Sequence, residues 1–197
     1  MHIFENNETY EQMSSFQKWR AELTPQVPPV LKSKRMTVEE IDAPTKEPLE
    51  QYFPALLSTM PKYCKIKAAE PDPNHIPCPL RIGCVLSGGQ ASGGHNVIVG
   101  LFEYIKKIHP GSQLYGFVGG PEGIYKNQYM ELKEEKVFYY KNRGGFDMIG
   151  SGRHKIESDE HKNDSLRNCE ALKLDGLVII GGDDSNTNAC ILAEYFA

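Results

Sequence analysis

The order of apolar and polar positions divides the chain into two parts. In residues 81–197, short apolar runs alternate with glycine-rich loops and with segments whose apolar residues recur every three or four positions. Short apolar runs are typical of buried strands, and the longer spacing is typical of helices packed along one face. Strands that alternate with helices predict a doubly wound, mostly parallel α/β sheet, with its ligands at the carboxyl ends of the strands.

Two strand, loop and helix units carry this pattern most clearly. The run Ile82–Leu86 predicts a strand, and the loop SGGQASGGHN at 87–96 follows it. The helix after that loop is expected to turn one apolar face inward, formed by Val97, Ile98, Leu101, Phe102 and Ile105. Near the other end, GLVIIGG at 176–182 predicts a buried strand, and Thr187–Phe196 starts a helix.

A further strand and a further helix lie between these units. The segment QLYGFVGG at 113–120 predicts a strand that runs into a glycine turn. The segment 158–175 predicts a mostly solvated helix whose inward-facing residues are Leu166, Cys169 and Leu172.

Proline and glycine mark a boundary near residue 80. All 18 glycines lie after it, whereas 11 of the 13 prolines lie before it. Because proline breaks helices and is excluded from central strands, residues 1–80 predict short helices joined by extended segments. We therefore expect a mainly helical, proline-rich extension at 1–80, suited to packing or oligomer contacts, and an α/β domain at 81–197.

Composition and charge narrow the function classes. The 197 residues include 40% hydrophobic residues and carry a net charge of -4, which is typical of a globular protein without a basic surface for nucleic acid. Since no run of about 18 apolar residues occurs, a membrane span is not expected. The five cysteines form no CxxC pair and no signal peptide is evident, which predicts a cytoplasmic protein.

The first glycine loop, with Gly88 and Gly89, has the properties of a phosphate site. Its small residues let an anion approach the backbone amides, and it opens a helix, whose N-terminus favours negative charge. The sequence fits neither a Walker A motif nor GxGxxG. The alternative is a tight turn without a ligand, which one or two glycines would be enough to make.

The second loop, GGDDSN at 181–186, places two carboxylates where an anion would be expected. Mg²⁺ is held in proteins by one or two carboxylates together with substrate phosphates. A bound Mg²⁺ ion would therefore attract both Asp183 and a phosphate group, which would otherwise repel each other. Asp183 is therefore the candidate Mg²⁺ ligand. The alternative is that Asp183, Asp184 or Ser185 caps the helix.

Arg153 lies in a glycine- and serine-rich loop between these two segments. A guanidinium group can bind phosphate oxygens with two hydrogen bonds and offset charge that develops during transfer. The alternative is an ordinary solvated arginine. His154 and His161 lack further ligands at metal spacing, so we interpret them as surface histidines.

Four segments together resemble the phosphofructokinase family, and within it the pyrophosphate-dependent branch of the catalytic subunit type. They occur in the family's order, at 83–106, 114–124, 144–158 and 174–194. The resemblance implies Mg²⁺-dependent, reversible phosphoryl transfer from pyrophosphate to fructose 6-phosphate, a step of glycolysis, in a homo- or hetero-oligomer.

The resemblance also implies roles for single residues. It assigns Gly88, Gly89 and Ser185 to the phosphoryl donor, Arg153 to the donor's terminal phosphate and to catalysis, and Asp183 to Mg²⁺. ATP-dependent relatives have glycine where this chain has Asp184. A carboxylate there would repel the α-phosphate of ATP, so Asp184 is expected to select pyrophosphate.

Several features depart from the family pattern. Ser92 stands where proline is usual, and His154 where aspartate commonly follows the arginine. The Thr-Ile-Asp motif that carries the family's catalytic base, and the Met-Gly-Arg sugar-phosphate motif, do not occur. We therefore expect an N-terminal piece of a longer enzyme, inactive alone. The alternatives are an ATP-dependent phosphofructokinase and a non-catalytic regulatory or binding subunit.

Overall fold

Contacts divide the chain into two units, Met1–Leu23 with Pro77–Leu192 and Thr24–Ile76 with Ala193–Ala197. The computed structural model describes residues 2–3, 13–24, 26, 35–41, 51–59, 64–69 and 76–197. Most of the extended proline segments predicted before residue 80 lie outside the described residues. The boundary placed at residue 80 stays a prediction.

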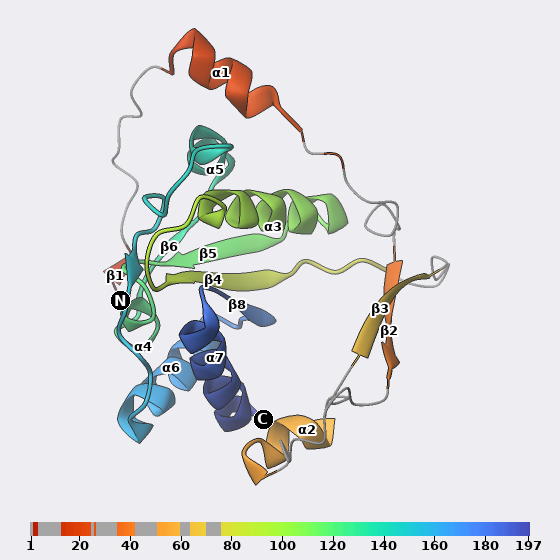
Figure 1. The fold of residues 1–197 in the computed structure, drawn as a ribbon, viewed down its shortest axis with the longest axis vertical. Helices are drawn as coiled ribbons and strands as arrows, with labels where there is room; N and C mark the ends of the chain where they lie inside the picture. Colours follow the sequence, from red (N-terminus) through yellow and green to blue (C-terminus); the bar gives the residue numbers. More distant parts are fainter. Residues whose placement is uncertain are drawn as a thin grey trace. The chain divides into compact units, whose positions relative to one another are not determined.

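A mixed six-stranded sheet forms the centre of the described part of the first unit (Figure 1). Its strands are β1 (His2–Ile3), β4 (Arg81–Ser87), β5 (Gln113–Phe117), β6 (Gln128–Glu131), β7 (Ser151–Gly152) and β8 (Gly176–Ile180). Strand β4 pairs in parallel with β5, β7 and β8, and β1 pairs in parallel with β6. The β5–β6 pair is antiparallel. The predicted α/β class with a mostly parallel sheet is confirmed.

Helices cover both sides of this sheet (Figure 1). They are α3 (Gly94–Ile108), α4 (Glu122–Tyr125), α5 (Glu134–Tyr140), α6 (Asp159–Ala171) and α7 (Asp183–Phe196). Helices α3 and α5 contact each other on one side, and α4 and α6 contact each other on the other side. The loops at the carboxyl ends of β4 and β8 therefore lie at one end of a two-sided α/β layer, as in other doubly wound folds.

The apolar face of α3 packs on β4, with one change from the prediction. Ile98, Phe102 and Ile105 join Cys84 and Leu86 of β4 in the buried cluster. Val97 was predicted to face inward, but its side chain is exposed, and Val99 is buried instead. The reason is geometric, because each helical residue turns by about 100° and Val97 lies beside the buried stripe, which consists of Gly94, His95, Ile98, Val99, Phe102 and Ile105.

Strand β8 forms where GLVIIGG predicts it, but it is half-buried along its whole length rather than buried. It pairs with β4 along one edge, and its other edge carries no strand among the described residues.

Helix α6 also forms as predicted and buries Cys169 and Leu172, whereas Leu166 is only half-buried. On the same helix, the Asn168 amide donates hydrogen bonds to the carbonyls of Ile124 and Tyr125, which ties α6 to α4.

The described residues before residue 80 contain two helices, α1 (Ser15–Glu22) and α2 (Pro54–Thr59), and also a two-stranded antiparallel sheet. Its strands, β2 (Arg35–Glu40) and β3 (Cys64–Ala69), were not predicted. The sequences RMTVEE and CKIKAA contain β-branched residues and no proline, so both can form ladder hydrogen bonds. Each run is six residues long and lies between stretches that contain proline, which dominate the pattern before residue 80.

His95 fixes the loop that leads to Arg153. Its ring is fully buried at the start of α3. The Met148 amide donates to Nε2 at 3.0 Å, so Nδ1 carries the proton and donates to the Arg143 carbonyl, also at 3.0 Å. Gly94 lets Phe146 of the same loop pack closely, since a Cβ there would lie 2.1 Å from the Phe146 ring. The loop is therefore held to α3 by a neutral imidazole.

A pH dependence of stability follows from this burial. Burial lowers the pKa of His95 below its usual 6.5, against smaller opposing effects of the Arg143 carbonyl and the Asp147 charge. Below about pH 6.5 the unfolded chain binds a proton that the folded chain excludes, so stability should fall as the pH drops towards the lowered pKa. Thermal unfolding of the wild type and of His95→Asn, measured between pH 5 and pH 8, checks this. A wild-type slope that equals the slope of the variant would contradict it.

Candidate donor and metal site

The glycine loop after β4 requires glycine at Gly88 and approaches Arg153 at Gly89. Gly88 has a φ of 94°, a left-handed backbone conformation that favours glycine, and its amide donates to the Gly152 carbonyl at 2.9 Å. At Gly89, a Cβ would lie 3.3 Å from a terminal nitrogen of Arg153. The turn alternative accounts for Gly88 alone. Gly89 lies beside a guanidinium group, which is a favourable surrounding for an anion.

The predicted second loop is largely helical. Helix α7 begins at Asp183, four residues before the predicted start at Thr187. The Thr187 hydroxyl donates to the Asp183 carbonyl, and the Asn186 amide donates to the Gly182 carbonyl. These side-chain bonds add to the backbone bond from the Asn186 amide to the Gly182 carbonyl, in a sequence with low helix propensity. Asp183 and Asp184 consequently stand in the first helical turn.

Ser185 links the two loops rather than capping the helix. Its hydroxyl lies 2.8 Å from the hydroxyl of Ser87 at the end of β4. Gly181 permits this approach, because a Cβ there would lie 2.5 Å from the Ser185 hydroxyl oxygen and 2.6 Å from the Ser87 carbonyl oxygen. The carboxyl ends of β4 and β8 are thereby held together. A role for Ser185 in donor binding stays a prediction.

The two aspartates differ in their surroundings. Asp184 is largely exposed, and its carboxylate lies 3.9 Å from the ammonium group of Lys155. Within the described residues, the Asp183 carboxylate has no hydrogen-bond or ion-pair partner. No side-chain hydrogen bond of Asp183 among the described residues therefore supports the alternative that it caps the helix. Both carboxylates still gain from the positive end of the α7 dipole.

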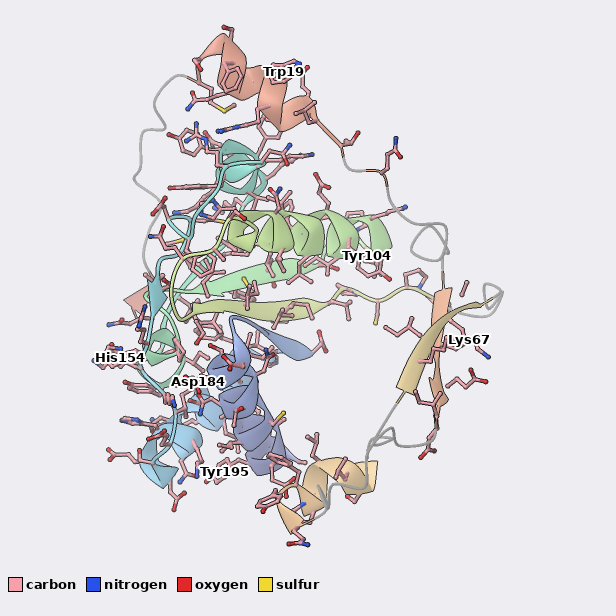
Figure 2. The ribbon with its side chains drawn as sticks, viewed as in Figure 1. Trp19, Lys67, Tyr104, His154, Asp184 and Tyr195 are labelled. Carbon is pink, nitrogen blue, oxygen red and sulfur yellow. The ribbon has the colours of Figure 1, made fainter. Side chains whose placement is uncertain are left out.

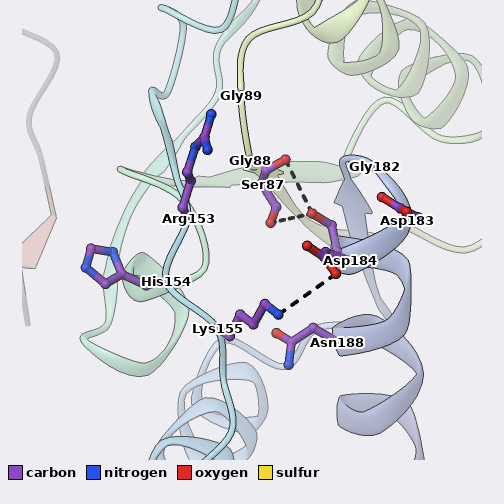
Figure 3. A pocket seen from close by; sticks show the side chains of 11 residues that line it. Ser87, Gly88, Gly89, Arg153, His154, Lys155, Gly182, Asp183, Asp184 and Asn188 are labelled. Atoms are coloured by element: carbon purple, nitrogen blue, oxygen red, sulfur yellow. Dashed lines mark hydrogen bonds and ion pairs between the residues drawn. The ribbon is translucent and has the colours of Figure 1, made fainter.

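Arg153, His154 and Lys155 lie on an extended segment opposite the first turn of α7 (Figure 3). Lys155 points towards Asp184, whereas the His154 ring points away from it. His154 Nδ1 lies 3.0 Å from the Glu122 carboxylate on α4. The hydrogen bond from Lys126, together with the charges of His154 and Lys126, lowers the pKa of Glu122. Figure 2 shows His154 and Asp184 near the same end of the sheet.

These three stretches enclose a cavity of about 270 Å³ (Figure 3). Its lining residues are Ser87, Gly88, Gly89, Arg153, His154, Lys155, Gly182, Asp183, Asp184, Ser185 and Asn188. All six residues predicted for the site lie there, although they come from three separate segments. The cavity combines backbone amides, cations and carboxylates, which is the chemistry of a site for a phosphate group with a metal ion.

The residue types at the cavity can be compared with the ligands that Mg²⁺ takes in proteins. In the described part of the chain, no three side chains of His, Cys, Asp or Glu gather as a metal cluster. The described residues thus do not supply a complete set of protein ligands for a metal ion. Mg²⁺ usually needs only one or two carboxylates when phosphate oxygens and water complete its shell, and Asp183 with its neighbour Asp184 fits that pattern.

Five lining residues are not among the six predicted: Ser87 and Gly182, which lie in the two predicted loops, and His154, Lys155 and Asn188. Lys155 had a signal, since residues two apart in an extended segment point to the same side and Arg153 was already a candidate. Asn188 had no such signal. Of the three other residues singled out, His154 lines the cavity, whereas Ser92 is exposed and does not. His161 stacks on Tyr125 with ring centroids 3.9 Å apart, away from the cavity.

Comparison with known proteins gives consistent matches. The family model described as "Phosphofructokinase" matches residues 81–196. The chain is 60% identical over 117 residues to pyrophosphate--fructose 6-phosphate 1-phosphotransferase subunit beta 2 of Arabidopsis thaliana, covering 59% of this chain and 21% of that protein. It is 38% identical to subunit alpha of Solanum tuberosum, covering 94% and 32%.

A solved structure shares the fold. Phosphofructokinase of Pichia pastoris in the T-state is 25% identical, with a TM-score of 0.51, covering 64% of this chain and 13% of that one. The chain therefore spans about a fifth to a third of the length of the two relatives that it matches in sequence. In the described residues, no helix is long and apolar enough to cross a membrane.

Proposed function

This chain belongs to the phosphofructokinase family, and on that premise we propose that the protein at its full natural length transfers a phosphoryl group from pyrophosphate to fructose 6-phosphate. One observation carries the proposal. A single cavity brings together the glycine loop, the Arg153–Lys155 segment and the two aspartates of α7. The names of the two sequence relatives support the same donor and acceptor.

Different residues of the chain would bind different parts of pyrophosphate. The Gly89 amide would donate a hydrogen bond to its oxygens, and Gly88, whose own amide bonds to the Gly152 carbonyl, would shape the turn that presents it. The first turn of α7 adds a favourable dipole. Arg153 would bind the terminal phosphate with two parallel hydrogen bonds and offset the charge of the transferring group. Asp183 would hold Mg²⁺, and Asp184 beside it would exclude a donor larger than pyrophosphate. That ion would neutralise the phosphate oxygens when bound.

The reaction forms a bond between the 1-oxygen of fructose 6-phosphate and phosphorus, and it breaks the bridging P–O bond of pyrophosphate. The products are fructose 1,6-bisphosphate and phosphate, and the hydroxyl proton passes to a base. No Thr-Ile-Asp sequence occurs in these 197 residues. We therefore expect no turnover from this chain alone.

Donor choice tests the proposal directly. The full-length protein should form fructose 1,6-bisphosphate from fructose 6-phosphate with pyrophosphate, and chelation of Mg²⁺ should abolish the reaction. Turnover with ATP but not with pyrophosphate would instead establish the ATP-dependent alternative. Pyrophosphate binding in calorimetry without turnover would support a regulatory or binding subunit.

Assembly is the second element of the proposal. The relatives are named as alpha and beta subunits, which supports an oligomer with its own copies or with a second type of subunit. Light scattering of the purified full-length protein should give a mass of at least two chains. A monomer that is fully active would overturn this element and leave the donor assignment intact.

A further inference from the structure

Asn188 joins the two halves of the cavity through its side-chain amide. Its Oδ1 accepts a hydrogen bond from the Ile156 amide at 3.1 Å, and its Nδ2 donates to the Ile156 carbonyl at 2.9 Å. Ile156 is 1% exposed. The Asn188 amide therefore pairs with a buried stretch of backbone as a neighbouring strand would, and it satisfies both polar groups of that residue.

The position of Asn188 on α7 relates this contact to the aspartates. Asn188 stands one helical turn after Asp184, on the same face. Asp184 contacts Lys155, and Asn188 contacts Ile156, the next residue of the facing segment. The helix and the segment are thus joined at two successive points, of which the Asn188 contact is the shorter and the better protected.

The other end of the facing segment is also fixed. Strand β7 pairs with the end of β4, Ser87 with Gly152, and the Gly152 carbonyl accepts from the Gly88 amide. Arg153 and Lys155 therefore lie on a short span between the glycine loop and the Asn188 contact. His154 contacts Glu122 from the same span. Removal of the Asn188 amide would leave the end nearest the aspartates without its backbone hydrogen bonds.

From this geometry we propose that Asn188 is a positioning residue for the phosphoryl donor, which holds Arg153 and Lys155 in register with Asp183 and Asp184. The inference rests on the proposed function and deepens it. Asn188 acts through backbone and need not touch the donor. A displacement of about 1 Å in groups that position a substrate can cost about 100-fold in rate, so a small shift of the segment has a large effect.

The test compares Asn188→Ala with Asn186→Ala in the full-length protein. Asn186 is on the same helix, but among the described residues its side-chain amide donates only to the carbonyl of Gly182, just before the helix begins. For Asn188→Ala we expect the KM for pyrophosphate to rise about 10-fold and the KM for fructose 6-phosphate to change by less than about 2-fold. Hydrogen exchange in the peptide 153–158 should accelerate. Asn186→Ala should leave all three quantities close to the wild type.

A second variant keeps the test decisive if the alanine variant does not fold. Asn188→Asp has nearly the same size and keeps an acceptor for the Ile156 amide, but it cannot donate to the Ile156 carbonyl. The same selective rise in the KM for pyrophosphate is expected. Faster exchange at 153–158 with unchanged kinetics would overturn the proposal, and so would an equal rise in both KM values, since a purely structural role predicts either.

The same experiment separates this inference from the proposed function. If the wild type neither turns over nor binds pyrophosphate with Mg²⁺, the proposed function is wrong, and the inference is overturned with it. If the wild type binds pyrophosphate without turnover, the dissociation constant takes the place of the KM and should rise about 10-fold in Asn188→Ala. If the wild type uses pyrophosphate and Asn188→Ala matches it, the inference alone fails.

Discussion

Asp183→Asn should lower kcat/KM for pyrophosphate by about 1,000-fold in the full-length protein, because an amide replaces the carboxylate proposed to hold Mg²⁺. The side chain has almost the same shape, so the cavity and helix α7 should remain. The concentration of Mg²⁺ that gives half-maximal rate should rise strongly in the variant. Steady-state kinetics across a Mg²⁺ titration measures both effects.

Asp159→Asn is the matched control for this substitution. Asp159 also stands in the first turn of a helix, α6, and its carboxylate contacts Lys162 on the surface. A first-turn carboxylate stabilises a helix by about 0.3–1 kcal/mol through the dipole, so both variants should lose a similar small amount of stability. If Asp183→Asn changes stability alone, as Asp159→Asn should, then Asp183 only supports the helix and the metal assignment is wrong.

The elements with continuous apolar runs were predictable from sequence. Strand β4 is mostly buried, and its short continuous run of apolar residues is the pattern of a buried strand. In the next helix, Ile98, Phe102 and Ile105 repeat at helical spacing. The start of α7 was not predictable in this way. Gly182, Asp183 and Asp184 have low helix propensity, and the contact of Ser185 with Ser87, which holds this turn against the end of β4, is visible only in three dimensions.

The residues of the candidate site were predictable one by one, but their supports were not. Gly89, Arg153 and Asp183 belong to residue types with a clear chemistry for phosphate or metal. The contact from Asn188 to Ile156 joins residues 32 apart in sequence. An asparagine in a helix has no pattern that identifies such a partner. Local pattern thus predicts chemistry, whereas the register between segments depends on tertiary contacts.

Asp184→Gly should change the choice of phosphoryl donor. We expect kcat/KM for pyrophosphate to fall about 10- to 100-fold, because the change frees Lys155 from its partner and removes a carboxylate next to the metal ligand. Turnover with ATP should become measurable. A unit charge about 4 Å from a phosphate oxygen costs between about 1 and about 4 kcal/mol as the solvent around it is reduced, and this repulsion would be relieved. Initial rates with each donor at saturating fructose 6-phosphate provide the measurement.

Asp184→Asn separates charge from bulk at the same position. The asparagine keeps the volume of the side chain and removes only its charge. If repulsion excludes ATP, both variants should accept it, whereas if the side chain merely fills the space of the nucleotide, only the glycine variant should. Asp184 is largely exposed and its contact with Lys155 is long, so solvent screens the pair and its loss should cost little stability. Pyrophosphate activity that is unaffected by Asp184→Gly would remove Asp184 from the donor site altogether.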